Sequence, residues 1–569
     1  MLHLLIGTDW TANRDEILRR ISRDVKEEKG NRILLVPELV SHEMERHLCT
    51  WAGDTASRFA EVLSFTRLGR RVCEYMGCGT IEALDKGGRV VAMAAAARQL
   101  HSRLKAYAAV ETKPEFLTGL IEAVDEFKRC CISAEDLMAA SQSAGGSLAQ
   151  KLEELALLLE SYDALCAQGK RDPRDQENLL LEQMELGDFG ENHVFYIDGF
   201  PDFTRQHLAI LEHLIRTSPN VTIAINCDSV ASPMLAFEKA GDTASQIIRC
   251  AKHAGVDVQI ERIRPKESPM NLLREHLYQG PISEGELKDY VRVCRTETVD
   301  QECLAAVEQI QDLVRNGARY RDITVVCADL PGYQNMVRLA FHRCGIPEYL
   351  SGTEDILQKS VISTVLSAMD AALGDFEQRS VLRYLRSVLS PVEPDLCDFV
   401  ENYAIVWGVR GKKRLEEWKN HPEGLSGIWD EATEKLLLEI ESARRMAMEP
   451  LARLAGSFDN ARSMKQQVEG LYDFLEAIRL EERLDLLAQE MDGLGDNRSS
   501  QILGQLWEIL VGAMEQLYDV LGNTHWDAET FTRLFQLLLS QYDVGTIPPV
   551  LDAVQVGPIS ASDSISRSI

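Results

Sequence analysis

Short apolar runs recur along the first part of the chain and predict buried strands. Each is about five residues long and apolar at successive positions, as in strands of a parallel sheet that helices cover on both faces. Segments with helical spacing separate the runs, and this alternation predicts an α/β lobe with a doubly wound sheet. The predicted strands are residues 2–6, 32–36, 61–65, 193–197 and 221–225.

The stretch between the third and fourth predicted strands is longer than a crossover needs, and its patterns are all helical. We therefore predict that residues 79–189 form a helical insertion in the first lobe. That lobe then comprises residues 1–78 and 190–288. The sequence predicts one sheet domain interrupted by one helical domain.

A second α/β segment begins near residue 289, with predicted strands at 291–295 and 323–328. The pattern turns helical again over residues 376–545, where apolar residues such as Ile502, Leu506 and Ile509 recur with a 3.6-residue period. One more strand is predicted at 551–557. The predicted second lobe is residues 289–375 and 546–569, and we expect it to be incomplete because the chain stops soon after that strand.

Composition narrows the class of protein. A chain of 569 residues is long enough for several domains. Its net charge of −28 argues against a uniformly basic surface, although a local basic groove for nucleic acid stays possible. The 13 cysteines have no metal-finger spacing, and no apolar run is long enough for a signal peptide or a membrane span. These features predict a cytoplasmic protein with reduced thiols and no metal site of its own.

The chain opens with a strand, a glycine, a short polar loop and a helix in "HLLIGTDWTANRDEIL", residues 3–16. A Walker A loop, G-x-x-x-x-G-K-[ST], needs a second glycine, a lysine for the phosphates and a hydroxyl for magnesium. Counted from Gly7 and Thr8, those positions hold Ala12, Asn13 and Arg14. The loop has the outline of a phosphate loop without its binding groups. A plain strand–turn–helix with no nucleotide ancestry stays an alternative.

The segment "VFYIDGF", residues 194–200, resembles a Walker B strand. Asp198 stands where magnesium would be held, and Gly199 stands where an active enzyme has the glutamate that polarises water. Losing the lysine, the hydroxyl and the glutamate together removes charge neutralisation, metal binding and water activation. We therefore expect no ATP hydrolysis, with the alternative that Asn13 and Arg14 form an atypical working site.

The order of the lobes and insertions resembles superfamily 1 helicases, and several segments resemble the AddB component of the AddAB helicase–nuclease of Gram-positive bacteria. This resemblance implies two RecA-like, P-loop NTPase-type parallel-sheet lobes, each with a large helical insertion. It also implies a role in double-strand break repair and homologous recombination. The expected partners are DNA, as double-strand ends and single strands, and an AddA-type helicase–nuclease subunit. The segments are residues 33–48, 61–72, 196–214, 320–350 and 401–418.

The resemblance also places candidate DNA contacts on loops at the tips of the sheets. Basic residues there would contact phosphates, and aromatic rings would stack on bases. For Phe65, Phe200 and Phe203 a core role is an equal alternative, and for the second basic cluster so is a solvated loop. The candidates are Pro37, Ser64, Phe65, Arg67, Arg70, Arg71, Arg410, Lys412 and Lys413, with the neighbouring Glu38, Thr66 and Arg414.

The resemblance implies three cofactors for full-length family members, namely Mg²⁺, ATP and a 4Fe–4S cluster in a C-terminal nuclease domain. That domain is expected beyond residue 569, and none of the cysteines here matches the cluster ligands by position. We therefore expect no cofactor in this chain. Two hypotheses follow: a catalytically silent, DNA-binding scaffold that pairs with an active motor subunit, or an active ATP-dependent helicase or exonuclease subunit with an atypical phosphate loop.

Overall fold

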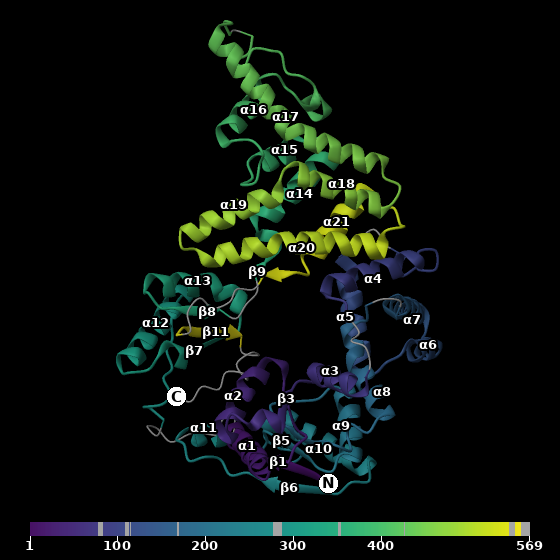
Figure 1. Ribbon diagram of the computed structural model, residues 1–569, viewed down its shortest axis with the longest axis vertical. Helices are drawn as coiled ribbons and strands as arrows, with labels where there is room; N and C mark the ends of the chain where they lie inside the picture. Colours follow the sequence, from purple (N-terminus) through teal and green to yellow (C-terminus); the bar gives the residue numbers. More distant parts are fainter. Residues whose placement is uncertain are drawn as a thin grey trace.

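The structure is a computed structural model, shown in Figure 1. It describes residues 1–77, 83–108, 113, 115–167, 170–276, 287–350, 354–425, 427–544 and 552–558.

The first lobe is built on a six-stranded parallel sheet with strand order β3-β2-β4-β5-β1-β6. All five strands predicted in this part of the chain are confirmed within a residue or two. The sixth, β6, was not predicted. The strands are β1 (Leu2–Ile6), β2 (Arg32–Leu35), β3 (Ala60–Leu63), β4 (Val194–Ile197), β5 (Val221–Ile225) and β6 (Val258–Arg262).

Helices cover both faces of this sheet because its strands are apolar on both sides. Leu5 and Leu34 pack with α1 (Trp10–Lys26) and α2 (Ser41–Ala52) on one face. Leu4 lies in the apolar cluster of the opposite face. The helices of that face are α3 (Phe65–Met76), α8 (Gln176–Leu186), α9 (Arg205–Thr217) and α10 (Glu238–His253). The sheet is therefore doubly wound.

The second lobe has a smaller parallel sheet with strand order β7-β11-β8. The predicted strand at 291–295 is wrong, because those residues form no strand and Val293 is 91% exposed. Residue 551 of the last predicted strand lies outside the described residues, and the strand found there starts at Val554. The elements are α12 (Val299–Arg315), β7 (Thr324–Cys327), α13 (Leu330–Arg343), β8 (Glu348–Leu350) and β11 (Val554–Pro558).

Two helical regions interrupt the lobes. The first comprises α4 (Lys86–Gln99), α5 (Glu115–Arg129), α6 (Ala134–Ser143) and α7 (Gly146–Ala167). The second comprises α14 (Ser360–Leu373), α15 (Gln378–Leu385), α16 (Pro394–Val406), α17 (Glu431–Asn460), α18 (Met464–Ala477), α19 (Leu480–Gly493), α20 (Asn497–Leu521) and α21 (Ala528–Leu539). Short elements at the junctions are α11 (Met270–His276), β9 (Glu354–Asp355) and β10 (Asp543–Val544).

These elements confirm an α/β protein with two parallel sheets and extensive helical regions. In Figure 1 the first lobe lies at one end, the second region's α16 and α17 lie at the other, and the second lobe lies between them on one side. The boundaries 79–189 and 376–545 stay predictions, and residues 79–82 of the first lie outside the described part.

Candidate functional site

The loop that resembles a phosphate loop is short and capped. β1 ends at Ile6 and α1 begins at Trp10, so only Gly7, Thr8 and Asp9 separate them. Asp9 caps the helix, because its Oδ1 accepts a hydrogen bond from the Thr11 backbone N–H at 3.1 Å. Its Oδ2 accepts another from the backbone N–H of Lys266 at 3.0 Å. The helix N-terminus, where a phosphate would bind, is thus already occupied by a carboxylate.

Asn13, at the position of the phosphate-binding lysine, holds the loop closed. It lies inside α1 with Ala12 and Arg14, and its side chain is buried. Its Nδ2 donates to the carbonyl of Gly7 at 3.1 Å and to that of Ile225 at 3.4 Å. A Cβ at Gly7 would lie 2.5 Å from Asn13 Oδ1, which explains the glycine. The amide thus ties the ends of β1 and β5 together.

Arg14 and Asp198 form a buried ion pair at the centre of the site. The Nε of Arg14 lies 3.1 Å from Oδ2 of Asp198, and both side chains are less than a tenth exposed. The guanidinium also lies over the ring of Trp10, 4.6 Å from its centroid. Burial raises the pKa of Asp198, and the charge of Arg14 acts in the opposite direction. The pair joins α1 to the end of β4.

Gly199 has a backbone conformation that disfavours the missing glutamate. Its φ is +83°, in the region that favours glycine, and a Cβ there would lie 3.2 Å from Cδ of Pro37. Position 14 carries no hydroxyl, and the carboxylate of Asp198 is engaged by Arg14. These residues therefore do not fit a magnesium ion with a bound triphosphate.

A cavity of about 550 Å³ remains beside the ion pair. It lies at the carboxyl ends of β1, β4 and β5, where open α/β sheets bind ligands. Its size is within the range of small-molecule sites. Both cations at its rim are paired, Arg14 with Asp198 and Lys239 with Asp202. Its lining includes Trp10, Arg14, Asp198, Phe200, Phe237 and Lys239.

Two of the three predicted base-stacking rings, Phe65 and Phe203, lie in the core, whereas Phe200 is half-buried beside the cavity. Ser64 caps α3, because its Oγ accepts from the Arg67 backbone N–H at 3.2 Å. Phe65 is 6% exposed and stacks on His207, with ring centroids 4.1 Å apart. Phe200 meets Phe65 edge-on, and Phe203 is also buried. This placement matches the core role that the sequence left open for Phe65 and Phe203.

The basic cluster on α3 is partly neutralised. Arg67 pairs with Glu45 at 2.9 Å, and Arg71 makes two contacts of 3.1 Å with Glu61. Arg70 is exposed. Half-buried Pro37 directly precedes the short turn Glu38–Val40 after β2 and makes no capping hydrogen bond with its side chain.

The second basic cluster lies in the short turn Gly411–Leu415 and just before it, between α16 and α17. Arg410, Lys412 and Lys413 are exposed, whereas Arg414 is 1% exposed and belongs to the interior. The structure does not bring the two clusters together, because α3 lies in the first lobe and α16 lies at the far end of the molecule (Figure 1).

Sequence reasoning missed the roles of Asp9, Trp10 and His207. An aspartate directly before a helix is a recognisable cap signal, so Asp9 could have been found. The stacking partners of Arg14 and Phe65 had no such signal, because they depend on tertiary packing. Among the described residues, no group of three or more His, Cys, Asp or Glu side chains is placed to hold a metal ion. None of the described helices is long and apolar enough to cross a membrane.

Comparison with known proteins gives the family context. Residues 4–275 match the family described as "ADDB, N-terminal". The chain is 28% identical to the second (B-type) subunit of the ATP-dependent helicase/deoxyribonuclease of Thermoanaerobacter sp. (strain X514), over 99% of this chain and 50% of that protein. The protein of the same name from Caldanaerobacter subterraneus subsp. tengcongensis is 26% identical, over 94% of this chain and 48% of its own length.

A third relative, from Clostridium botulinum (strain Langeland), has the same name and is 25% identical over 98% of this chain and 50% of its own length. The chain therefore spans about half the length of the curated relatives that it matches.

Proposed function

We propose that this chain, whose residues 4–275 match the N-terminal family of AddB, serves as the helicase-like part of a helicase–nuclease subunit in double-strand break repair and homologous recombination. In this role it binds DNA ends and single strands and pairs with an AddA-type helicase–nuclease subunit in the cytoplasm. Its own nucleotide site is degenerate, and the partner supplies the ATP-driven motion.

The buried Arg14–Asp198 ion pair carries the proposal. A working site needs the carboxylate at the end of this strand for magnesium and a lysine for the phosphates. Here Arg14 is paired with the carboxylate of Asp198 at 3.1 Å, and the side chain of Asn13 donates a hydrogen bond to the Gly7 carbonyl in the loop. Opening the site to a metal ion would leave Arg14 buried without its partner, which is energetically unfavourable.

Exposed cations support DNA binding by an otherwise acidic chain. Arg70 in the first lobe and Lys412 and Lys413 in the second helical region are exposed and available to phosphates. The acidic surface elsewhere would confine DNA to such places.

Isothermal titration calorimetry of the full chain with ATP, with and without Mg²⁺, tests the degenerate site. We expect no binding heat in either condition. Titration of the same preparation with a single-stranded oligonucleotide is the positive control, and we expect it to give binding heat. Magnesium-dependent ATP binding would overturn the proposal of a silent site, and absence of oligonucleotide binding would overturn the proposed DNA-binding role.

The cavity beside the ion pair favours a second candidate, an atypical nucleotide site in an active ATP-dependent helicase or exonuclease subunit. Its volume of about 550 Å³ and the rings of Trp10, Phe200 and Phe237 suit a planar base. On this alternative the chain binds ATP, and Phe237→Ala lowers its affinity for ATP at least tenfold. The control variant Phe116→Ala, at an exposed ring of α5, leaves that affinity unchanged. Calorimetry of the two variants distinguishes the candidates.

A further inference from the structure

One helix, α4, forms part of the core of both helical regions. Its residues Val90 to Ala97 are all buried, so this stretch of the helix is apolar on every side. It packs against α5 and α7 of the first region and against α20 and α21 of the second. Buried residues of both regions consequently belong to one continuous apolar cluster. We call the two regions together, residues 86–167 and 360–539, the helical arch.

Polar contacts at the start of α4 join the two halves of the arch. The Oδ2 of Asp85 accepts hydrogen bonds from Gln516 Nε2 at 2.7 Å and from the hydroxyl of Tyr542 at 3.1 Å. Lys86 pairs with Asp543 at 3.4 Å. Gly87 lies directly beneath Tyr542, and a Cβ at that position would collide with the tyrosine hydroxyl. The glycine inside the helix is therefore explained by close packing between the halves.

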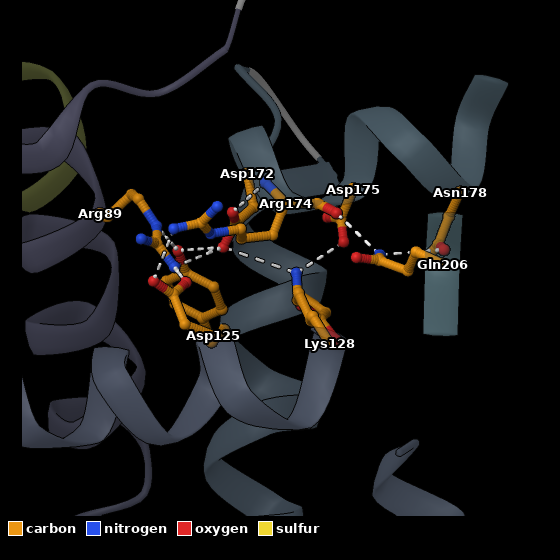
Figure 2. Close-up of polar contacts among 10 residues, drawn as sticks. Arg89, Asp125, Lys128, Asp172, Arg174, Asp175, Asn178 and Gln206 are labelled. Carbon is orange, nitrogen blue, oxygen red and sulfur yellow. Dashed lines mark hydrogen bonds and ion pairs between the residues drawn. The ribbon is translucent and has the colours of Figure 1, made fainter. Parts of the chain in front are cut away.

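A buried ionic joint anchors the arch to the first lobe (Figure 2). Its centre is Asp172, which is fully buried where the chain leaves the first helical region. Asp172 accepts hydrogen bonds from the Tyr162 hydroxyl at 2.6 Å, from Arg89 Nη2 at 3.3 Å and from the backbone N–H of Arg174 at 2.8 Å. Helices α4 and α7 are thus fixed to the segment that leads back into the lobe.

Lys128 of α5 is the second cation of this joint. Its Nζ lies 2.7 Å from Asp175, 2.8 Å from Asp163 and 3.5 Å from Asp172. Burial lowers the pKa of Lys128, but these carboxylates raise it overall, so the ammonium stays charged. Removing one member would leave buried charges without partners, which makes the joint resistant to opening.

The lobe side of the joint is held by Gln206 of α9. Its Nε2 donates to the carbonyl of Arg174 and to Oδ1 of Asn178, both at 3.1 Å. Figure 2 shows these contacts continuing the line of ion pairs from α4 and α5 toward α9. The network therefore runs without interruption from the arch into the first lobe.

The connections between the arch and the second lobe run through strands β9 and β10, and β10 packs against α20 of the arch. Strands β9 and β10, at the entry to and exit from the second helical region, pair with each other in antiparallel register. Glu348 of β8 lies 3.9 Å from Arg338 of α13. Burial raises the pKa of Glu348, whereas the charges of Arg338 and of Arg498 in α20 lower it. The charge of Arg498 in the arch thus acts on the carboxylate of Glu348 in the second lobe.

We propose that the helical arch is a single rigid body that fixes the spacing of the two lobes. Ligand-driven proteins with two lobes commonly work by hinge closure around the ligand. Here the common core and the buried joint at Asp172 oppose such closure. The chain therefore acts as a fixed frame, and this inference holds independently of whether it binds DNA.

Distances between the lobes in the full chain test the proposal. Genetically encoded spin labels at the exposed positions Lys252 of α10 and Glu308 of α12 report the spacing by pulsed electron paramagnetic resonance. We expect one narrow distance distribution that does not shift when ATP with Mg²⁺, or a single-stranded oligonucleotide, is added. A broad distribution, or a shift with either addition, would overturn the rigid frame without affecting the calorimetric test of the silent site.

Two glycines of the first helical region provide a matched pair of variants. Gly87→Ala forces Tyr542 away and should broaden the distance distribution, whereas Gly119→Ala in α5, where a Cβ meets nothing within 4 Å, should not. Asp172→Asn should also broaden it, because Arg89 and Lys128 each lose the charge of one carboxylate partner. Circular dichroism checks that each variant is folded. If folded Gly87→Ala and Asp172→Asn proteins both keep the narrow distribution, these contacts do not fix the spacing and the proposal is overturned.

Discussion

At the scale of single residues, Arg14 and Asp198 form a buried ion pair at positions that carry a hydroxyl and a metal-binding carboxylate in a working nucleotide site. Two charges that are almost entirely buried lose their hydration, and their mutual contact, with the Trp10 ring beside Arg14, compensates for that loss. The sequence indicated that Arg14 replaces the hydroxyl of a working nucleotide site, whereas Asp198 keeps the position of the magnesium-binding carboxylate. It did not predict that they bind each other, because Arg14 and Asp198 are far apart in sequence and their pairing depends on the register of α1 above the sheet.

Removing the cation of this pair should destabilise the first lobe. Arg14→Met leaves the carboxylate of Asp198 buried and unpaired, and such changes cost about 3–5 kcal/mol. The double variant Arg14→Met/Asp198→Leu should recover most of that loss, since no charge remains. Urea unfolding, followed by hydrogen exchange of the β1 and β4 amides, measures the free energy of unfolding of this lobe.

Arg19 provides the control within the same helix. It pairs with Glu16, but its side chain is 62% exposed, so Arg19→Met should cost at most about 1 kcal/mol. Equal losses for Arg14→Met and Arg19→Met, or no recovery in the double variant, would show that the buried pair is not a structural unit.

At the scale of elements, the sequence predicted strands well where they are covered on both faces. Residues of β1 and β5 are buried almost throughout, so an apolar run was sufficient evidence. The strand β6, with the sequence Val-Gln-Ile-Glu-Arg, lies at the sheet edge and is largely exposed, so it has no such run. The error at 291–295 is the converse case, because alternating valines without a neighbouring strand form no sheet.

The boundary between β1 and α1 depends on Asp9, and its removal should loosen the start of the helix. Asp9→Ala removes the acceptor for Thr11 and for the backbone N–H of Lys266, and the loss of such a cap costs about 0.5–2 kcal/mol. Asp9→Asn keeps an acceptor oxygen and should lose less. Amide hydrogen exchange in the first turn of α1 measures the effect. Equal exchange rates in the wild-type and Asp9→Ala proteins would contradict the role given to this cap.

At the scale of the whole molecule, the sequence predicted two sheet lobes and two helical regions but not how the regions meet. The contact depends in part on Gly87 of α4, which lets Leu538 of α21 and Tyr542 approach closely. A pattern of small residues is typical of any buried helix, so it does not say which helices will be its neighbours. The sequence did not predict the ionic joint at Asp172 for a similar reason, since the residues that pair with Asp172 come from separate helices.

The separation of the two exposed basic clusters makes a prediction about DNA binding by the whole chain. Each lysine or arginine that contacts a phosphate of single-stranded DNA contributes about 0.7 to the slope of log K against log salt. Replacing Lys412 and Lys413 together by alanine should lower affinity for a long oligonucleotide and reduce its slope by about 1.4. Arg70→Ala should reduce the slope by about 0.7, whereas Arg71→Ala should change it less, because Glu61 already neutralises that guanidinium.

Fluorescence anisotropy over a range of salt concentrations measures these slopes. Unchanged slopes for both the Arg70 and the double lysine variants would mean that the DNA path avoids both clusters.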